Sequence, residues 1–182
     1  MKKYAYIYTF LVAILLFTGC SNEDNDQNPE LDSDYYFRFK ENSTLVDYPY
    51  SQYSQQATYI YKEGYGHELI VVSRKQSNST SINSWSLAMG TWDECQTQYD
   101  YTESTPVSIL GALILQYWDE NGTWYYSSRN YGKATIRIQE ITESYISGSF
   151  SGTLLDIDVS GAIPIVRDSV LISDGEFKVP TP

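Results

Sequence analysis

Residues 146–154 read ISGSFSGTL and decide the fold class, because apolar residues or glycines alternate with hydroxyl side chains along the whole stretch. Ile146, Phe150 and Leu154 share one face with two glycines, and the opposite face carries only serine and threonine. A period of two residues is typical of a β-strand with one buried face. The stretch therefore predicts a strand whose apolar face lies in a core.

The same period recurs before and after this stretch. Residues 35–40 place Phe37 and Phe39 on the face opposite Arg38 and Lys40. Further alternating or apolar runs lie at residues 57–62, 67–74, 85–89, 109–115, 134–139, 166–173 and 176–179. Residues 69–72 are continuously apolar, which predicts a strand covered on both faces. Between the last two runs, Asp174-Gly175 predicts a hairpin turn.

About nine or ten strands at short spacing, without an amphipathic helix, predict an all-β domain. An antiparallel β-sandwich is the expected architecture, and a β-barrel is the alternative. The expected core contains Phe37, Phe39, Ile136, Ile138, Ile146, Phe150, Leu154 and Phe177.

The first 19 residues are predicted to be a signal peptide. Lys2 and Lys3 precede an apolar stretch at residues 4–17, which is too short to cross a bilayer, since a span takes about 20 apolar residues. Residues 16–20 read LFTGC and resemble a lipobox, whose cysteine is lipidated after cleavage. We therefore expect a lipid anchor at Cys20 that attaches the protein to a membrane. The alternative is an ordinary signal peptide with an incidental cysteine.

Residues 20–34 are predicted to form an acidic flexible tether, because residues 21–34 contain six acidic side chains and no cation. An acidic cluster directly after the cysteine resembles the surface-export signal of Bacteroidota lipoproteins. That resemblance implies a location on the outside of the outer membrane, and the alternative is a plain spacer. Residues 35–182 are expected to form a single all-β domain.

Three motifs of the folded part carry a family resemblance. They are the FRF strand at residues 37–39, the pattern ITESYISGSFSGTL at residues 141–154 and the closing ISDGEFKVP at residues 172–180. Together they resemble the small surface lipoproteins of Bacteroidota that have one all-β domain. The resemblance implies a fold and a location, and it transfers no catalytic residue.

Charge and residue counts argue against several functions. Twelve Lys plus Arg against 23 Asp plus Glu give a net charge of −11, which is unsuited to a nucleic-acid partner. His67 is the only histidine and Cys95 is the only cysteine of the expected domain, so neither a zinc site nor a thiol active site is expected. No cofactor, no metal and no enzymatic activity are predicted. Because carboxylates are plentiful, a glycoside hydrolase is retained as the least favoured function.

An aromatic hairpin supplies the candidate binding site. Asn121-Gly122 lies between two aromatic runs and predicts a two-residue turn. In that register Trp118 lies opposite Tyr125, whereas Trp124 and Tyr126 face the core. The candidate ligand-binding residues on the outer face are Trp118, Tyr125, Gln116 and Glu120.

These observations favour a non-catalytic binding module, whose ligand would be a glycan stacked on the aromatic pair. A structural or assembly subunit of a cell-envelope complex is the alternative, with an envelope protein as partner. A second sheet or a loop that covers Trp118 and Tyr125 would remove the site, and the sequence leaves this open.

Overall fold

The computed structural model describes residues 34–51, 54–75, 83–102, 105, 113–127 and 130–182. These residues form strands and no helix, so none of them belongs to a helix long and apolar enough to span a membrane. The strands are β1 (Tyr36–Glu41), β2 (Thr44–Tyr48), β3 (Gln55–Lys62), β4 (Gly66–Arg74), β5 (Ser84–Thr91), β6 (Asp100–Thr102), β7 (Ile114–Trp118), β8 (Trp124–Tyr126), β9 (Lys133–Ile141), β10 (Tyr145–Asp158) and β11 (Ile165–Pro180).

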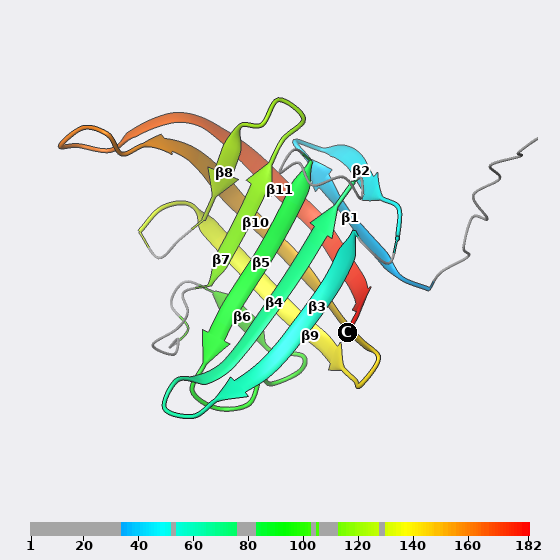
Figure 1. Cartoon of the computed structure of the whole chain (residues 1–182). Coiled ribbons are helices and arrows are strands. Elements are labelled where there is room, and N and C mark those ends of the chain that lie inside the picture. The colour runs from blue at the N-terminus through cyan, green and yellow to red at the C-terminus, as the bar shows by residue number, and fades with distance from the viewer. Residues whose placement is uncertain (1–33, 52–53, 76–82, 103–104, 106–112, 128–129) are drawn as a thin grey trace, which may run out of the picture. The chain divides into compact units, whose positions relative to one another are not determined.

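All strands belong to one antiparallel sheet with the order β2-β1-β11-β10-β8-β7-β5-β4-β3, and β9 and β6 branch from β10. The branch arises because the first part of β10 pairs with β9, whereas Leu155 further along pairs with Tyr126 of β8. Figure 1 shows the layer of β3, β4, β5 and β7 crossing in front of β9, β10, β11 and β1. The sheet is thus curled into a half-barrel. This confirms the all-β prediction. The half-barrel has two facing layers, as a sandwich does, but both layers belong to one continuous sheet, as in a barrel.

Aromatic rings from both layers meet in the core. Trp85 of the front layer lies 4.9 Å from Phe39, 5.2 Å from Phe150 and 5.9 Å from Phe37, measured between ring centroids. Burial of each such side chain contributes about 1.5–3 kcal/mol, and a well-oriented aromatic pair adds about 0.5–1.5 kcal/mol. All eight residues that the sequence predicted for the core are buried.

Two glycines make room for these rings on the inner face. Gly148 pairs with Phe177, and Gly175 pairs with Phe150, so each ring lies beside a residue without a side chain. A Cβ atom on either glycine would lie 2.8 Å from an atom of its neighbouring ring, which is too close. Gly148 of the ISGSFSGTL stretch and Gly175 are therefore part of the packing between β10 and β11.

The Asp174-Gly175 hairpin prediction is wrong, because β11 continues through both residues. Asp174 has a positive φ of 49° and is the extra residue of a β-bulge against both β1 and β10. A bulge and a tight turn both accept a residue with positive φ, so the same dipeptide suits either. Here β1 and β10 pair with β11 on both sides of the bulge, which keeps the strand continuous.

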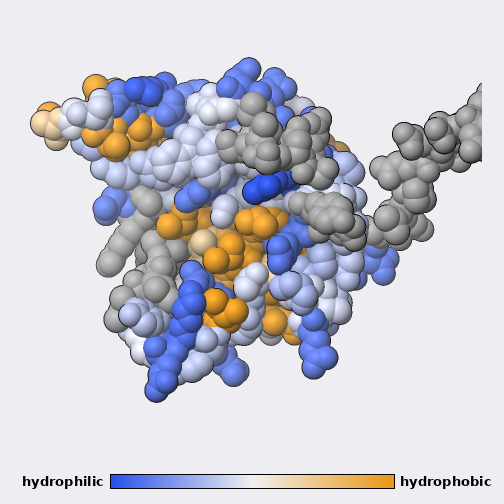
Figure 2. Space-filling model, viewed as in Figure 1, coloured by the Kyte–Doolittle hydropathy of each residue, from blue (hydrophilic) through white to orange (hydrophobic). Residues whose placement is uncertain are grey.

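Only the inner face of β4 is fully covered. Leu69 and Val71 are buried, whereas Ile70 and Val72 are half-buried on the outer face. Ile70 lies beside Ala88 of β5, which in turn lies beside Ile114 of β7. We call Ile70, Val72, Ala88 and Ile114 the outer apolar row, and Figure 2 shows apolar residues gathered over these strands.

The packing predicts a large effect of one truncation. Phe150→Ala removes a ring that contacts both Phe37 and Trp85, so we expect the free energy of unfolding to fall by about 3–5 kcal/mol. Urea denaturation of the full chain measures this loss. Leu171→Ala is the control, since Leu171 is exposed and its replacement should change stability by no more than about 0.5 kcal/mol. Equal losses in the two variants would contradict the proposed core.

Candidate functional site

The β7–β8 hairpin has a register one residue away from the predicted one. Trp118 pairs with Trp124, and Tyr117 pairs with Tyr125. Gly122 has a positive φ of 81° and donates its amide to the Asp119 carbonyl (3.2 Å), while the Asp119 amide donates to the Thr123 carbonyl (3.1 Å). This is a three-residue loop that ends in a left-handed glycine. The two-residue turn expected at Asn121-Gly122 is therefore wrong.

A register shift of one residue exchanges the two faces of a strand. Tyr125, one of the predicted ligand-binding residues, is consequently on the inner face and only 7% exposed. Its ring stacks on Tyr117, and its hydroxyl donates to Asp168 (2.9 Å). Burial, together with the hydrogen bond to Asp168, raises the pKa of Tyr125 to about 12. Tyr125 is a core residue and does not share a surface with Trp118.

The outer face of the hairpin instead carries Gln116, Trp118, Trp124 and Tyr126. Trp124 is 44% exposed and lies 5.9 Å from Trp118 and 4.6 Å from Tyr126, with nearly parallel rings. At such a separation parallel rings overlap, so part of the aromatic surface is already covered. Glu120 is exposed in the loop. The four predicted residues are thus divided among the outer face, the loop and the core.

A better-formed aromatic site lies in the connection between β5 and β6. A hollow of about 240 Å³, which we call the loop pocket, is lined by Thr91, Trp92, Asp93, Glu94, Gln96, Tyr99, Tyr101 and Thr105. Trp92 is 50% exposed and Tyr99 is 45% exposed. Both rings therefore present apolar surface to solvent at the edge of one hollow.

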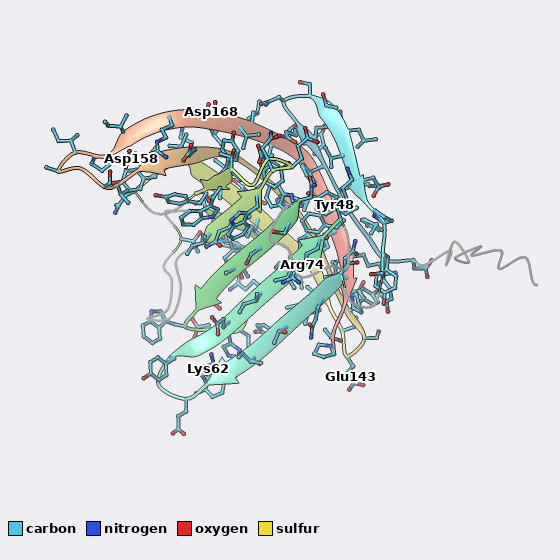
Figure 3. All side chains as sticks on the ribbon, turned by 45° about the horizontal axis from the view of Figure 1, so that its top comes forward. Tyr48, Lys62, Arg74, Glu143, Asp158 and Asp168 are labelled. Carbon is cyan, nitrogen blue, oxygen red and sulfur yellow. The ribbon has the colours of Figure 1, made fainter. Side chains whose placement is uncertain are left out.

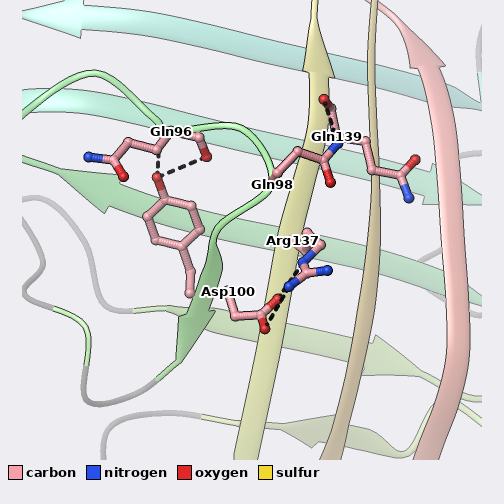
Figure 4. A network of polar contacts seen from close by, with 6 residues as sticks. Gln96, Gln98, Asp100, Arg137 and Gln139 are labelled. Carbon is pink, nitrogen blue, oxygen red and sulfur yellow. Dashed lines mark hydrogen bonds and ion pairs between the residues drawn. The ribbon is translucent and has the colours of Figure 1, made fainter.

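Hydrogen bonds to distant strands hold this loop in place. The Cys95 amide donates to the Tyr59 hydroxyl on β3 (2.9 Å), and the Gln98 amide donates to the Ile138 carbonyl on β9 (2.7 Å). The Gln96 amide donates to the Tyr101 hydroxyl (2.6 Å), which itself donates to the Gln96 carbonyl (3.3 Å). Figure 4 draws these two contacts at the Gln96 backbone as dashed lines.

An ion pair anchors the strand that follows the loop. The Arg137 guanidinium donates twice to the Asp100 carboxylate, at 2.6 and 3.0 Å, where β6 pairs with β9. Nearby, the Gln98 side chain donates to the Gln139 carbonyl (3.4 Å), as Figure 4 also shows. Exposed ion pairs contribute only about 0–1 kcal/mol to stability, but a two-fold contact restricts orientation. The pair therefore orients β6, which carries Tyr101.

The loop pocket combines apolar ring surface with hydrogen-bonding groups. Trp92 and Tyr99 offer rings, and Asp93, Glu94 and Gln96 offer carboxylate and amide groups. No cationic side chain occurs among the lining residues that the structure describes. The pocket thus suits a ligand with apolar C–H surface and hydroxyl groups, and its negative charge disfavours an anionic one.

Cys95 belongs to the same loop, but its thiol is poorly suited to nucleophilic chemistry. Burial raises its pKa, which keeps the thiol protonated, and the thiolate is the nucleophilic form. The His67 ring stacks on Tyr59 at 5.5 Å and lies tilted beside Tyr61 at 5.0 Å. In the part of the chain that the structure describes, no group of three or more His, Cys, Asp or Glu could hold a metal ion.

Sequence reasoning missed the loop pocket because residues 91–105 show no regular period. A usable signal was present in Trp92-Asp93-Glu94 and Tyr99-Asp100-Tyr101, which place large rings next to acids in a connecting segment. Large aromatic rings in an exposed loop leave apolar surface in water, and binding residues are often carried by loops.

Comparison of the chain with protein-family models, with curated proteins and with solved structures finds no match.

The hydrogen bonds that hold this loop predict a local effect of Tyr101→Phe. Loss of the hydroxyl removes both side-chain contacts to the Gln96 backbone, so we expect hydrogen exchange of the Gln96 amide to accelerate about tenfold. Hydrogen exchange followed by NMR measures this rate. The control is Tyr145→Phe, because the Tyr145 hydroxyl contacts an exposed Glu140 elsewhere. An unchanged exchange rate at Gln96 would show that Tyr101 does not hold the loop.

Proposed function

We propose that this protein is a lipid-anchored protein of the outer membrane that binds a glycan at the loop pocket without catalysing a reaction. The observation that carries the proposal is the position of two half-exposed rings, Trp92 and Tyr99, on one hollow together with carboxylate and amide groups. We assign the stacking role that was predicted for Trp118 to these two rings, which lie in the connection between β5 and β6.

A sugar ring matches this combination of groups. Its C–H face packs on an aromatic ring, and its hydroxyl groups donate to carboxylates and accept from an amide. Hydrogen bonds of the loop to Tyr59, Tyr101 and Ile138 hold the backbone in place before binding, which reduces the entropy lost on association. A hollow of about 240 Å³ is small for a ligand site, so we expect one sugar unit to enter it while the rest of the glycan lies on the surface.

The anchor and the location depend on residues outside the described part of the chain. Cys20 and the acidic residues 21–34 are the sequence features that support attachment to a membrane and display on its outer side. Each acyl CH₂ that enters the bilayer contributes about 0.8 kcal/mol, so two or three chains hold a soluble domain at the membrane. A binding domain on a tether would meet glycans outside the cell.

A subunit of an envelope complex is the second candidate, and two observations favour it. The first is the outer apolar row, which is half-buried on the outer face of the sheet. The second is the projecting ribbon at residues 156–169, which we call the arm and on which Figure 3 labels Asp158 and Asp168. Val159, Ile163, Ile165 and Val166 are exposed on the arm. Exposed apolar surface of this kind is typical of protein contacts.

The glycan proposal predicts selective loss of binding. On a glycan array, we expect the full chain purified in detergent to bind neutral glycans saturably and Trp92→Ala to weaken that binding at least tenfold, since a central aromatic contact contributes about 2 kcal/mol or more. Trp124→Ala is the matched control, because Trp124 is similarly exposed on the β7–β8 hairpin.

Loss of binding in Trp124→Ala alone would move the site to the hairpin. The subunit would be favoured by two results together. The array would show no binding, and an envelope protein would co-purify with the wild type but not with an Ile70→Ser variant.

The anchor makes a separate prediction. Cells that express the wild type should incorporate radiolabelled palmitate into the protein, whereas Cys20→Ala should remain unlabelled because it lacks the acceptor thiol. Cys95→Ala is the control and should be labelled like the wild type. Label retained in Cys20→Ala would refute the anchor.

A further inference from the structure

A second hollow lies at one end of the half-barrel. Its volume is about 270 Å³, and we call it the barrel-end pocket. It is lined by Glu41, Val46, Lys75, Asn83, Tyr117, Asp119, Glu120 and Asn121. Except for Val46 in the middle of β2, these residues lie where β1, β4 and β7 end and β5 begins. The loop pocket lies at the other end of β5, which spans eight residues, so the two sites are about 25 Å apart at roughly 3.3 Å per residue.

A hydrogen-bonded pair forms the inner wall of the barrel-end pocket. The Tyr117 hydroxyl, on β7, donates to the Glu41 carboxylate at the end of β1 (3.0 Å). Tyr117 stacks on Trp85, with ring centroids 4.9 Å apart. Burial, and then the neighbouring Tyr48 and Glu41, raises the pKa of Tyr117, so its hydroxyl stays protonated. The pair therefore offers one carboxylate acceptor and one hydroxyl to a ligand.

Two buried polar atoms beside this pair have no hydrogen-bond partner among the described residues. They are the Tyr48 hydroxyl and the Trp85 indole nitrogen, on side chains that are fully buried. Burial and then the charge of Glu41 raise the pKa of the Tyr48 hydroxyl, whereas the nearby side chains of Tyr117 and Trp85 lower it. Both atoms therefore belong, with the Tyr117–Glu41 pair, to one polar cluster behind the pocket.

The charges of the pocket restrict the ligand. Glu41, Asp119 and Glu120 carry three negative charges, and Lys75 carries one positive charge. Asp119 already accepts from the amides of Asn121 and Thr123, which shape the loop. The remaining groups include the amides of Asn83 and Asn121, so donors and acceptors are mixed. An anion would be repelled by the net negative charge, whereas a hydroxyl group both donates and accepts.

We propose that the barrel-end pocket binds one neutral hydroxylated ligand, a single monosaccharide unit, with Glu41 and Tyr117 as its contact residues. A ligand hydroxyl donates to Glu41 and accepts from Tyr117. The Tyr117 O–H then turns from Glu41 toward the ligand, and the ligand hydroxyl takes its place on the carboxylate. The proposal does not depend on glycan binding at the loop pocket.

The indole N–H signals of the full chain separate the two sites. The chain has four tryptophans, so a ¹H–¹⁵N spectrum reports Trp85 beside the barrel-end pocket, Trp92 in the loop pocket, and Trp118 and Trp124 on the outer face. Single Trp→Phe variants assign each signal. The probes are glucose, galactose and mannose, each titrated to roughly 10 mM, about tenfold above a Kd of 1 mM.

We expect at least one of these sugars to shift the Trp85 signal saturably. Glucuronate, which adds a carboxylate to the glucose ring, should bind at least tenfold more weakly than glucose if glucose is the sugar that binds. Movement of Trp92 alone would support the loop pocket and overturn the barrel-end site. Movement of Trp85 alone would support the barrel-end pocket and overturn sugar binding at the loop pocket.

Conservative variants then identify the contact residues. Glu41→Gln and Tyr117→Phe should each weaken the affinity measured from the Trp85 shift about tenfold. The first replaces a charged acceptor by a neutral amide, and the second removes a donor. Tyr145 and Glu140 form a similar but exposed hydroxyl–carboxylate pair at 2.6 Å, so Tyr145→Phe and Glu140→Gln are matched controls. The dispersion of the four indole signals shows whether each variant is folded. Unchanged affinity in both Glu41→Gln and Tyr117→Phe, or no movement of Trp85 with any sugar, overturns the proposal.

Discussion

The pairing of β10 with β11 is the constraint on which the rest of the fold depends. β10 carries β9 and β8 on its other edge, and β11 carries β1 on its other edge, so both layers are attached through this one pair. Phe150 lies beside Gly175 and Phe177 lies beside Gly148, and this reciprocal arrangement lets both rings enter the core between the layers. A larger residue at either glycine would displace a ring and weaken the contact of the layers.

Both hollows use the ends of strands from the front layer. The loop pocket begins where β5 ends, and the barrel-end pocket includes Asn83, directly before β5 begins. The two hollows differ in the hydrogen bonds around them. Backbone amides bonded to tyrosine hydroxyls and to a strand carbonyl hold the loop pocket, whereas a buried tyrosine paired with a carboxylate lines the barrel-end pocket. The sheet thus places the two hollows at opposite ends of β5, among the loops that connect its strands.

Sequence reasoning predicted the core and most of the strands, because alternation along one strand is a local property, but it did not predict β2 or β6. It failed where one dipeptide serves two geometries: Asn121-Gly122 belongs to a three-residue loop, and Asp174-Gly175 belongs to a bulge. Because of the first error, the predicted site placed Tyr125 on the surface, although this residue lies in the core. The loop pocket depends on the contact of Cys95 with Tyr59, which is 36 residues earlier in the chain. No local pattern encodes such a contact, since it arises only when β3 and the loop come together in the fold.

The position of β1 also has a consequence for the order of folding. β1 pairs with its neighbour β2 and with the last strand, β11, and the contact between Arg38 and Glu176 spans 138 residues. During synthesis, the first strand of the domain therefore lacks one of its two partners until almost the whole chain has been made. Contacts of such high sequence separation form slowly, because a long loop must close first. The pairing of β1 with β11 therefore forms only after the last strand has been synthesised.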